Sequence, residues 1–241
     1  VQETKPTHKK KAAVAMWASG EGTAQRIKEL IERAVNKRQE TELEVLALSI
    51  VEVKEELPVI QKEYQIIATT GITDLNIQAP FIPLERFIDQ NIEVILDQLL
   101  MESEMEETEF VSLDEETAKK TCVEFISENF IFINGSKLID PMWQFSTQIS
   151  QTMGIGNEEY GFKINLVMHT AGMIERIIRN ETLMVEQNEL TNITSDPLYN
   201  QLTASVVLLE DKIKVKVPIE EMYYLLRLVH NQLDKKEYTM P

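Results

Sequence analysis

The feature that most constrains the fold is a change of pattern at the acidic segment 102–109, Glu-Ser-Glu-Met-Glu-Glu-Thr-Glu. Its like charges repel one another and it has few apolar side chains to bury, which is typical of a linker or an exposed helix end. Short apolar runs alternate with segments of helical spacing before it, whereas almost every segment after it has a helical period. We therefore expect an α/β domain, an acidic linker at 104–110 and an all-α domain.

The alternating pattern of the first hundred residues predicts βαβ units around a parallel sheet. We expect strands at 12–18, 43–51, 65–70 and 79–83, and helices at 23–35, 55–64 and 84–101, with Pro58 in the first turn of the second helix. This domain is expected to span 12–103, after a disordered polar arm at 1–11.

The helical period after the linker predicts a five-helix bundle over 111–241. The expected helices cover 113–133, 137–152, 158–182, 196–212 and 218–236. Asp114 or Ser112 is expected to cap the first helix, and Pro218 to open the last. Asp140-Pro141 is expected to cause a break in helical structure near the second helix.

Charge and composition exclude several classes of protein. The chain has 24 basic and 40 acidic residues, a net charge of −16, and its basic run is Lys9-Lys10-Lys11, so we expect no direct contact with nucleic acid. No segment approaches the roughly 20 apolar residues that a membrane span requires, and no secretory pattern opens the chain. A single cysteine, Cys122, excludes an internal disulfide and fits a cytoplasmic protein. No cofactor or metal is expected.

His169 and Arg176 lie in the run Asn165-Leu-Val-Met-His-Thr-Ala-Gly-Met-Ile-Glu-Arg176. Positions 165, 169, 172 and 176 have helical spacing, so these residues form one stripe along an otherwise apolar helix. Arg176 is expected to lean back toward His169, as long helical side chains do. Because a neutral imidazole beside a guanidinium can accept and hold a phosphoryl group, we predict phosphorylation of His169, with Arg176 and Asn165 stabilising the phosphate.

A structural interpretation of His169 stays open beside this one. A single histidine on a mostly apolar helix is more often a hydrogen-bonded core residue than a reactive one. The functional interpretation requires that a phosphodonor can reach the ring and that the guanidinium of Arg176 faces it.

A glycine-containing loop, Ser19-Gly20-Glu21-Gly22-Thr23-Ala24, joins the first expected strand to the first expected helix. Free backbone amides at such a turn favour anions. Gln25 stands where a dinucleotide-binding loop needs its third glycine, and no Gly-Lys-Ser/Thr of a nucleotide-binding loop is present. The alternative is a turn that needs glycine for backbone geometry alone.

The run Trp17-Ala-Ser-Gly-Glu-Gly-Thr-Ala24 resembles the active loop of galactitol-type enzyme IIB domains of the bacterial sugar phosphotransferase system (PTS). In that family a cysteine at the end of the first strand carries the phosphate. Trp17 occupies its position here and has no ionisable nucleophile, and Cys122 falls in the other domain. The resemblance therefore implies a degenerate IIB loop at Trp17, Ser19, Gly20, Gly22 and Thr23, in a domain that acts as a scaffold or docking module.

The run His169-Thr-Ala-Gly-Met-Ile-Glu-Arg176 resembles the motif of the PTS regulation domain (PRD), a helical module of sugar-operon regulators. The phosphorylatable histidine of that family corresponds to His169 and its motif arginine to Arg176. Met168 replaces an acidic residue often found before the histidine. The second histidine of the family falls on Leu228, so we interpret His230 as a structural or surface residue; His8, in the basic arm, is interpreted as incidental.

This order of domains resembles the C-terminal end of the sigma-54-dependent activators of the levanase and mannose operon type, over nearly all residues after 11. The resemblance implies ATPase, DNA-binding and enzyme IIA-like parts upstream, and the start at Val1 without Met fits an excised or processed piece. It also implies phosphorylation by the phosphocarrier HPr or a phosphorylated enzyme IIB, which lowers activator function when sugar is scarce. The added charge would repel acidic neighbours or recruit Arg176 and Arg179.

A homo-oligomer formed through the PRD is expected, and the protein is not expected to be an enzyme. Two alternatives remain. One is a dimerisation or docking scaffold in which His169 is never phosphorylated. The other is an active enzyme IIB subunit, which the missing cysteine opposes.

Overall fold

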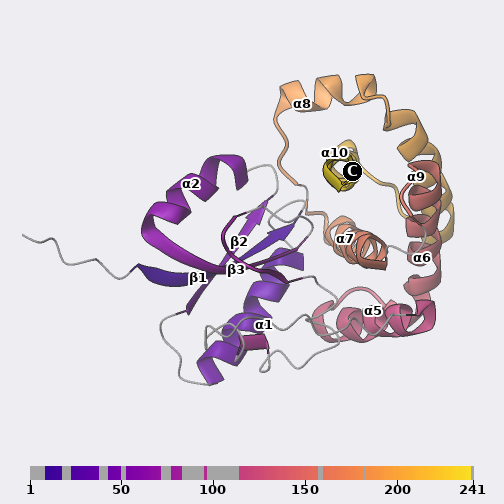
Figure 1. Cartoon of the computed structure of the whole chain (residues 1–241). Helices are drawn as coiled ribbons and strands as arrows, with labels where there is room; N and C mark the ends of the chain where they lie inside the picture. Colours follow the sequence, from indigo (N-terminus) through magenta and orange to yellow (C-terminus); the bar gives the residue numbers. More distant parts are fainter. Residues whose placement is uncertain are drawn as a thin grey trace, which may run out of the picture. The chain divides into compact units, whose positions relative to one another are not determined.

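The structure, a computed structural model, describes residues 9–17, 23–37, 43–49, 53–71, 77–82, 95–96, 114–156, 160–181 and 183–239. Two compact units are present: a sheet unit of residues 1–82 and 90–105, and a helical unit of residues 83–89 and 106–241 (Figure 1). The predicted fold class, α/β followed by an all-α part, is confirmed.

The sheet unit is built on four parallel strands in the order β2-β1-β3-β4. They are β1 (Lys10–Trp17), β2 (Leu43–Ser49), β3 (Tyr64–Gly71) and β4 (Phe81–Ile82). Helices α1 (Thr23–Lys37) and α2 (Val53–Glu63) lie on opposite faces of the sheet (Figure 1). This is the doubly wound arrangement that right-handed crossovers produce when the strand order reverses beside β1.

Central strand β1 is buried on both faces, which explains its nearly continuous apolar sequence. Val14 and Met16 pack with Leu48 of β2 and Val53 of α2 in one hydrophobic cluster. Gly71 ends β3 at φ +124°, and a Cβ at this position would lie 1.8 Å from the Met16 carbonyl oxygen. Only glycine therefore allows β3 to pass this close to the end of β1.

Several predictions for the N-terminal half fall on residues outside the described ranges. These are residues 1–8 of the arm predicted at 1–11, most of the glycine-containing loop, and the linker at 104–110. Lys10 and Lys11, which were also expected in that disordered arm, are instead the first residues of β1, where the backbone pairs with β2 and β3. Of the helix expected at 84–101 the structure describes Ile95 and Leu96, which are helical and buried.

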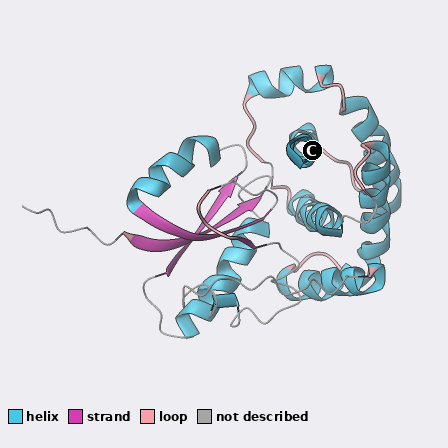
Figure 2. Cartoon of the chain, in the orientation of Figure 1, coloured by secondary structure: helices cyan, strands magenta, loops and turns pink. Residues whose placement is uncertain are grey.

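The helical unit contains α5 (Glu115–Asn129), α6 (Gly135–Thr152), α7 (Tyr160–Arg179), α8 (Gln187–Asn192), the short 3-10 helix η1 (Ile193–Ser195), α9 (Tyr199–Ile213) and α10 (Ile219–Thr239) (Figure 2). The five predicted helices correspond to α5, α6, α7, α9 and α10. Asp114 caps α5 by accepting a hydrogen bond from the Thr117 amide at 2.7 Å, as predicted.

Two predictions based on proline are wrong. Pro141 lies inside α6 and does not break it, and Pro58 lies inside α2 rather than in its first turn. Proline in a helix interior costs about 3 kcal/mol because it removes one backbone hydrogen bond and crowds the preceding turn. In α6, burial of Met142, Phe145 and Ile149 offsets this cost.

Helix α7 lies inside the helical unit. Figure 1 looks almost along its axis, with α5, α6 and α9 around it and α10 beside it. Every residue from Phe162 to Arg176 is buried, whereas most surface helices bury one face. No helix in the described part of the chain combines the length and apolar character that a membrane crossing requires.

Candidate functional site

The candidate site is the polar stripe of α7, which the structure places in the interior. His169 is 2% exposed and Asn165 is 8% exposed. Among the described residues, neither His169 Nε2 nor Asn165 Oδ1 has a hydrogen-bond partner. Such orphaned buried atoms are rare in folded proteins and call for an explanation in strain, function or bound water.

Burial keeps the imidazole neutral. Desolvation, assisted by the positive charge of Arg176, lowers the pKa of His169 from 6.5 to about 3. The neutral ring has a free nitrogen lone pair, which is the nucleophile that phosphoryl transfer to histidine requires.

Arg176 does not face an empty position. Its Nε and Nη2 atoms donate to Oε1 and Oε2 of Glu221, in the first turn of α10, at 2.8 Å each. Arg176 is 7% exposed and Glu221 2% exposed, so this bidentate ion pair is shielded from water. The structure therefore brings the charge of Arg176 near His169 but commits its hydrogen-bonding fork to Glu221.

The adjacent residue, Glu175, fastens α7 on another side. Its Oε1 accepts hydrogen bonds from the backbone amides of Ile131 and Phe132, at 2.8 and 3.3 Å. These amides belong to the connection between α5 and α6, which has no helix of its own to satisfy them. The C-terminal part of α7 is thus tied to two other elements by two neighbouring charged side chains.

Phosphorylation of His169 requires a ring that a phosphodonor can reach and a guanidinium of Arg176 that faces it. Neither condition is met in this conformation. The ring of His169 is enclosed, and the guanidinium of Arg176 is occupied. Phosphoryl transfer to His169 therefore requires this part of the helical unit to open.

The other histidine of the helical unit has a surface role. His230 Nε2 lies 2.8 Å from Asp196 Oδ2, and both side chains are partly exposed. Leu228 and Met168, the two departures from the family motif, are fully buried. His8 lies outside the described residues.

In the sheet unit, Trp17 is the last residue of β1, and its backbone pairs with Ser49 of β2. Ser19, Gly20 and Gly22 lie outside the described residues, and Thr23 is the first residue of α1. The loop thus leaves the carboxyl end of the strand at which the order reverses, where doubly wound sheets bind ligands.

Glu221 is not among the site residues predicted from the sequence. A signal was present, because Glu221, Leu225 and Leu228 have helical spacing and place a carboxylate on the apolar face of the last helix. A buried carboxylate on such a face requires a cation or hydrogen-bond donors. The sequence does not say which arginine supplies them.

Comparison with known proteins gives two findings. Residues 143–232, which include all of α7, match the family model of the PRD domain. The chain is also similar to the transcriptional regulatory protein LevR of Bacillus subtilis (strain 168), with 24% identity over 229 residues. This match covers 93% of the chain and 24% of LevR, so the chain spans about a quarter of the length of that relative. No solved structure matches.

Proposed function

From the premise that this chain carries a PRD domain and is a relative of a transcriptional regulator, we propose that it is the regulatory region of an activator of a sugar PTS operon. In this proposal residues 111–241 form the PRD, and residues 12–103 form an enzyme IIB-like domain without its cysteine. The activator is of the sigma-54-dependent type, and its ATPase and DNA-binding parts are on other segments of the protein.

We propose that His169 senses the phosphorylation state of the PTS. The observation that carries this proposal is that the PRD match contains the whole run from His169 to Arg176 on one helix. The donor is HPr or a phosphorylated enzyme IIB. The bond between phosphorus and the donor residue breaks as the imidazole nitrogen of His169 bonds to phosphorus. The donor residue, as the leaving group, takes up the proton that the imidazole releases.

The structure then corresponds to the unphosphorylated, closed state. A new phosphoryl group carries about −1.5 to −2 charges at pH 7, and it is not compatible with the enclosed position of the ring, whose Nε2 has no partner among the described residues. Phosphorylation therefore favours an open packing of the helical unit. Couplings of this kind are normally about 1–3 kcal/mol.

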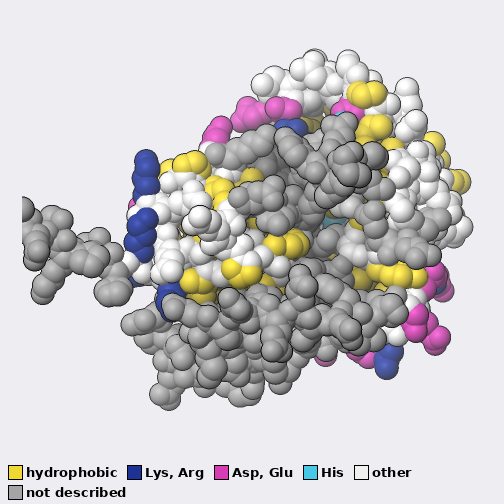
Figure 3. Space-filling model, in the orientation of Figure 1, with side chains coloured by type: hydrophobic (Ala, Val, Ile, Leu, Met, Phe, Trp, Pro, Cys, Tyr) yellow, Lys and Arg dark blue, Asp and Glu magenta, His cyan; other side chains and the backbone are white. Residues whose placement is uncertain are grey.

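The sheet unit is proposed to dock partners and not to catalyse. Trp17 ends the strand at which an enzyme IIB would carry its phosphocysteine, and it cannot form one. Among the coloured side chains of Figure 3, lysines and arginines form small separate groups on the face shown, and no continuous basic stripe. Because the chain carries a net charge of −16, we assign DNA contact to another part of the protein, and we place its site of action in the cytoplasm.

The test is phosphorylation of the whole chain with enzyme I, HPr, enzyme IIB and labelled phosphoenolpyruvate. We expect label on wild type and on His230→Gln, and none on His169→Gln. Because His230→Gln removes the other histidine of the helical unit, it is the matched control. Label that persists in His169→Gln but disappears in His230→Gln would show that the acceptor is on α10.

A second candidate function is a scaffold that is never phosphorylated. The 2% exposure of His169 favours it. It predicts no label on His169 with any donor, and a homo-oligomer whose formation does not respond to the PTS.

A further inference from the structure

The polar stripe of α7 has one charged member, Arg176, and among the described residues Glu221 of α10 forms an ion pair with it. Two hydrogen bonds of 2.8 Å join α7 to the first turn of α10. Both side chains are buried, so neither charge is satisfied by water if the other is removed. In such pairs, loss of one partner leaves an uncompensated charge inside the protein.

The guanidinium of Arg176 has chemistry that suits two alternative partners. Its planar fork binds a carboxylate and a phosphoryl group with the same bidentate geometry. A phosphoryl group carries more negative charge than a carboxylate. Glu221 therefore binds the guanidinium that a phosphoryl group on the same helix face would bind.

The placement of Arg176 on α7 makes this competition possible. Arg176 shares its stripe with His169, and its positive charge already acts on the imidazole. In a helix, a long side chain leans toward the N-terminus, which is the direction of His169 from Arg176. A rotation of the Arg176 side chain away from α10 would bring its fork toward the ring.

We propose that Glu221 is a positioning residue that holds Arg176 in the closed state, and that Arg176 moves from Glu221 to the phosphoryl group when His169 is phosphorylated. This inference rests on the proposed function of His169. It adds that Glu221 competes with the phosphoryl group for Arg176. The ion pair between α7 and α10 then exists only while His169 is unphosphorylated.

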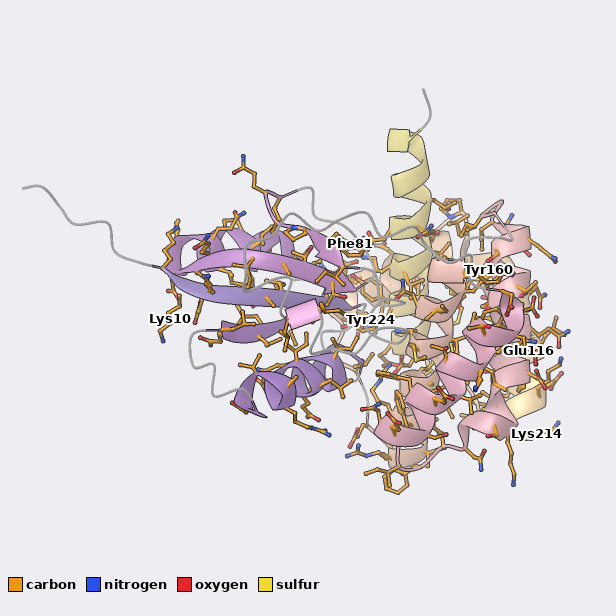
Figure 4. All side chains as sticks on the ribbon, turned by 60° about the horizontal axis from the view of Figure 1, so that its bottom comes forward. Lys10, Phe81, Glu116, Tyr160, Lys214 and Tyr224 are labelled. Carbon is orange, nitrogen blue, oxygen red and sulfur yellow. The ribbon has the colours of Figure 1, made fainter. Side chains whose placement is uncertain are left out.

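The consequence for α10 is local. Once Arg176 leaves, Glu221 is an unpaired carboxylate in the interior, and the first turn of α10 separates from α7 to hydrate it. Farther along α10, Tyr224 donates a hydrogen bond to the Met184 carbonyl at 2.9 Å, and His230 contacts Asp196 (Tyr224 is labelled in Figure 4). These contacts do not involve Arg176, so the middle of α10 keeps its anchor to segment 183–198.

The test compares wild type, Glu221→Gln and Glu220→Gln in the full chain. Glu220→Gln removes the same charge from the adjacent position, whose carboxylate is not the one bound to Arg176. Hydrogen exchange of the Met222 amide, which donates to the Pro218 carbonyl at 3.1 Å, measures opening of the first turn of α10 before and after labelling. Loss of label measures the lifetime of phosphohistidine. Phosphoramidate, which transfers its phosphoryl group to histidine and releases ammonia, serves as a second donor.

In wild type and Glu220→Gln, we expect phosphorylation to speed exchange at the first turn of α10 by roughly 5- to 150-fold, the usual range of allosteric coupling. In Glu221→Gln, exchange is already fast before labelling and phosphorylation adds little. Phosphohistidine lasts longer in Glu221→Gln, because Arg176 is free to bind it. A role of Glu221 in packing alone would not change the lifetime of the phosphate.

The proposal is overturned if phosphorylated wild type keeps the protection of this turn, or if Glu221→Gln leaves the phosphohistidine lifetime at the Glu220→Gln value. If Glu221→Gln does not fold, Arg176→Lys replaces it: the charge remains but the fork is lost, and a shorter lifetime is expected. Label from phosphoramidate but from neither protein donor contradicts the PTS function. The hydrogen-exchange comparison can then still be made on the protein labelled with phosphoramidate. Absence of label with both donors overturns both proposals.

Discussion

Helix α7 carries two groups of buried polar atoms that differ in how well they are satisfied. Near its C-terminal end, Glu175 accepts two backbone hydrogen bonds and Arg176 forms a bidentate ion pair. In its middle, His169 Nε2 and Asn165 Oδ1 have no partner among the described residues. The same helix is therefore firmly tied at one end and unsatisfied at its centre.

This difference separates two roles that burial alone does not distinguish. A fully bonded buried group stabilises one packing, and its loss is costly. An orphaned buried group raises the free energy of the closed packing and lowers the cost of leaving it. We infer that the C-terminal end of α7 holds the closed state, whereas the middle stores part of the free energy for opening.

The largest expected effect comes from breaking the tied end. Arg176→Met leaves the Glu221 carboxylate buried and unpaired, and we expect the free energy of unfolding of the helical unit to fall by about 3–5 kcal/mol. Urea denaturation followed by circular dichroism measures it. Arg179→Met is the control, because Arg179 is exposed and its ion pair with Glu181 is worth at most about 1 kcal/mol.

The double variant Arg176→Met/Glu221→Met sharpens this result. Replacing a whole buried ion pair by apolar side chains of similar volume is often neutral, so most of the lost stability should return. A double variant as unstable as Arg176→Met would mean that the pair is not the reason for the loss.

The next effect is a pH dependence that comes from the unsatisfied middle. An unfolded chain protonates His169 below about pH 6.5, but the folded ring stays neutral down to a pKa of about 3. Stability from this residue is therefore complete above pH 6.5 and is lost as the pH falls toward 3, by up to about 1.4 kcal/mol per pH unit. Urea midpoints from pH 7 to 5 should fall more steeply in wild type than in His169→Gln; equal slopes would contradict the buried neutral ring.

A smaller effect is expected at Glu175. Glu175→Gln keeps the size of the side chain but weakens the two hydrogen bonds to the amides of Ile131 and Phe132. We expect a loss of about 1–2 kcal/mol, because hydrogen bonds to charged groups are the stronger ones. Faster hydrogen exchange at residues 131 and 132, with α10 unchanged, would show that the two ties of α7 are independent.

The smallest effect is expected for the contact between His230 and Asp196 at the surface. Asp196→Asn weakens the contact with His230, where both side chains are partly exposed. A change below about 1 kcal/mol in urea denaturation is expected, as for other exposed pairs. A loss as large as that of Arg176→Met would remove the distinction between buried and surface pairs on which the comparison depends.

The positions of most elements could be predicted from sequence because the arrangement of apolar residues, periodic or continuous, reports which faces of a segment are buried. This held for β1, whose apolar run reflects burial on both faces, and for α7. It failed for α8, which buries none of its residues and so leaves no apolar period in the sequence. Pro141 was misjudged because the packing of α6, and not the proline itself, decides whether that helix continues.

The candidate site could be predicted only in part. The spacing of Asn165, His169 and Arg176 places them on one stripe once α7 is a helix. Their exposure depends on how other helices surround α7, which no local pattern contains. The partner of Arg176 is 45 positions away in sequence, and any of several acidic residues could have filled that place.

The two tryptophans of the chain are divided between the units, since Trp17 ends β1 and Trp143 lies on α6. Trp143 is buried, stacks on Tyr160 at the start of α7, and has the ammonium of Lys163 5.8 Å from its ring. Fluorescence from an indole depends on such neighbours. With Trp17 replaced by phenylalanine, emission from the single remaining indole would report movement of the first turn of α7 against α6, without any attached dye.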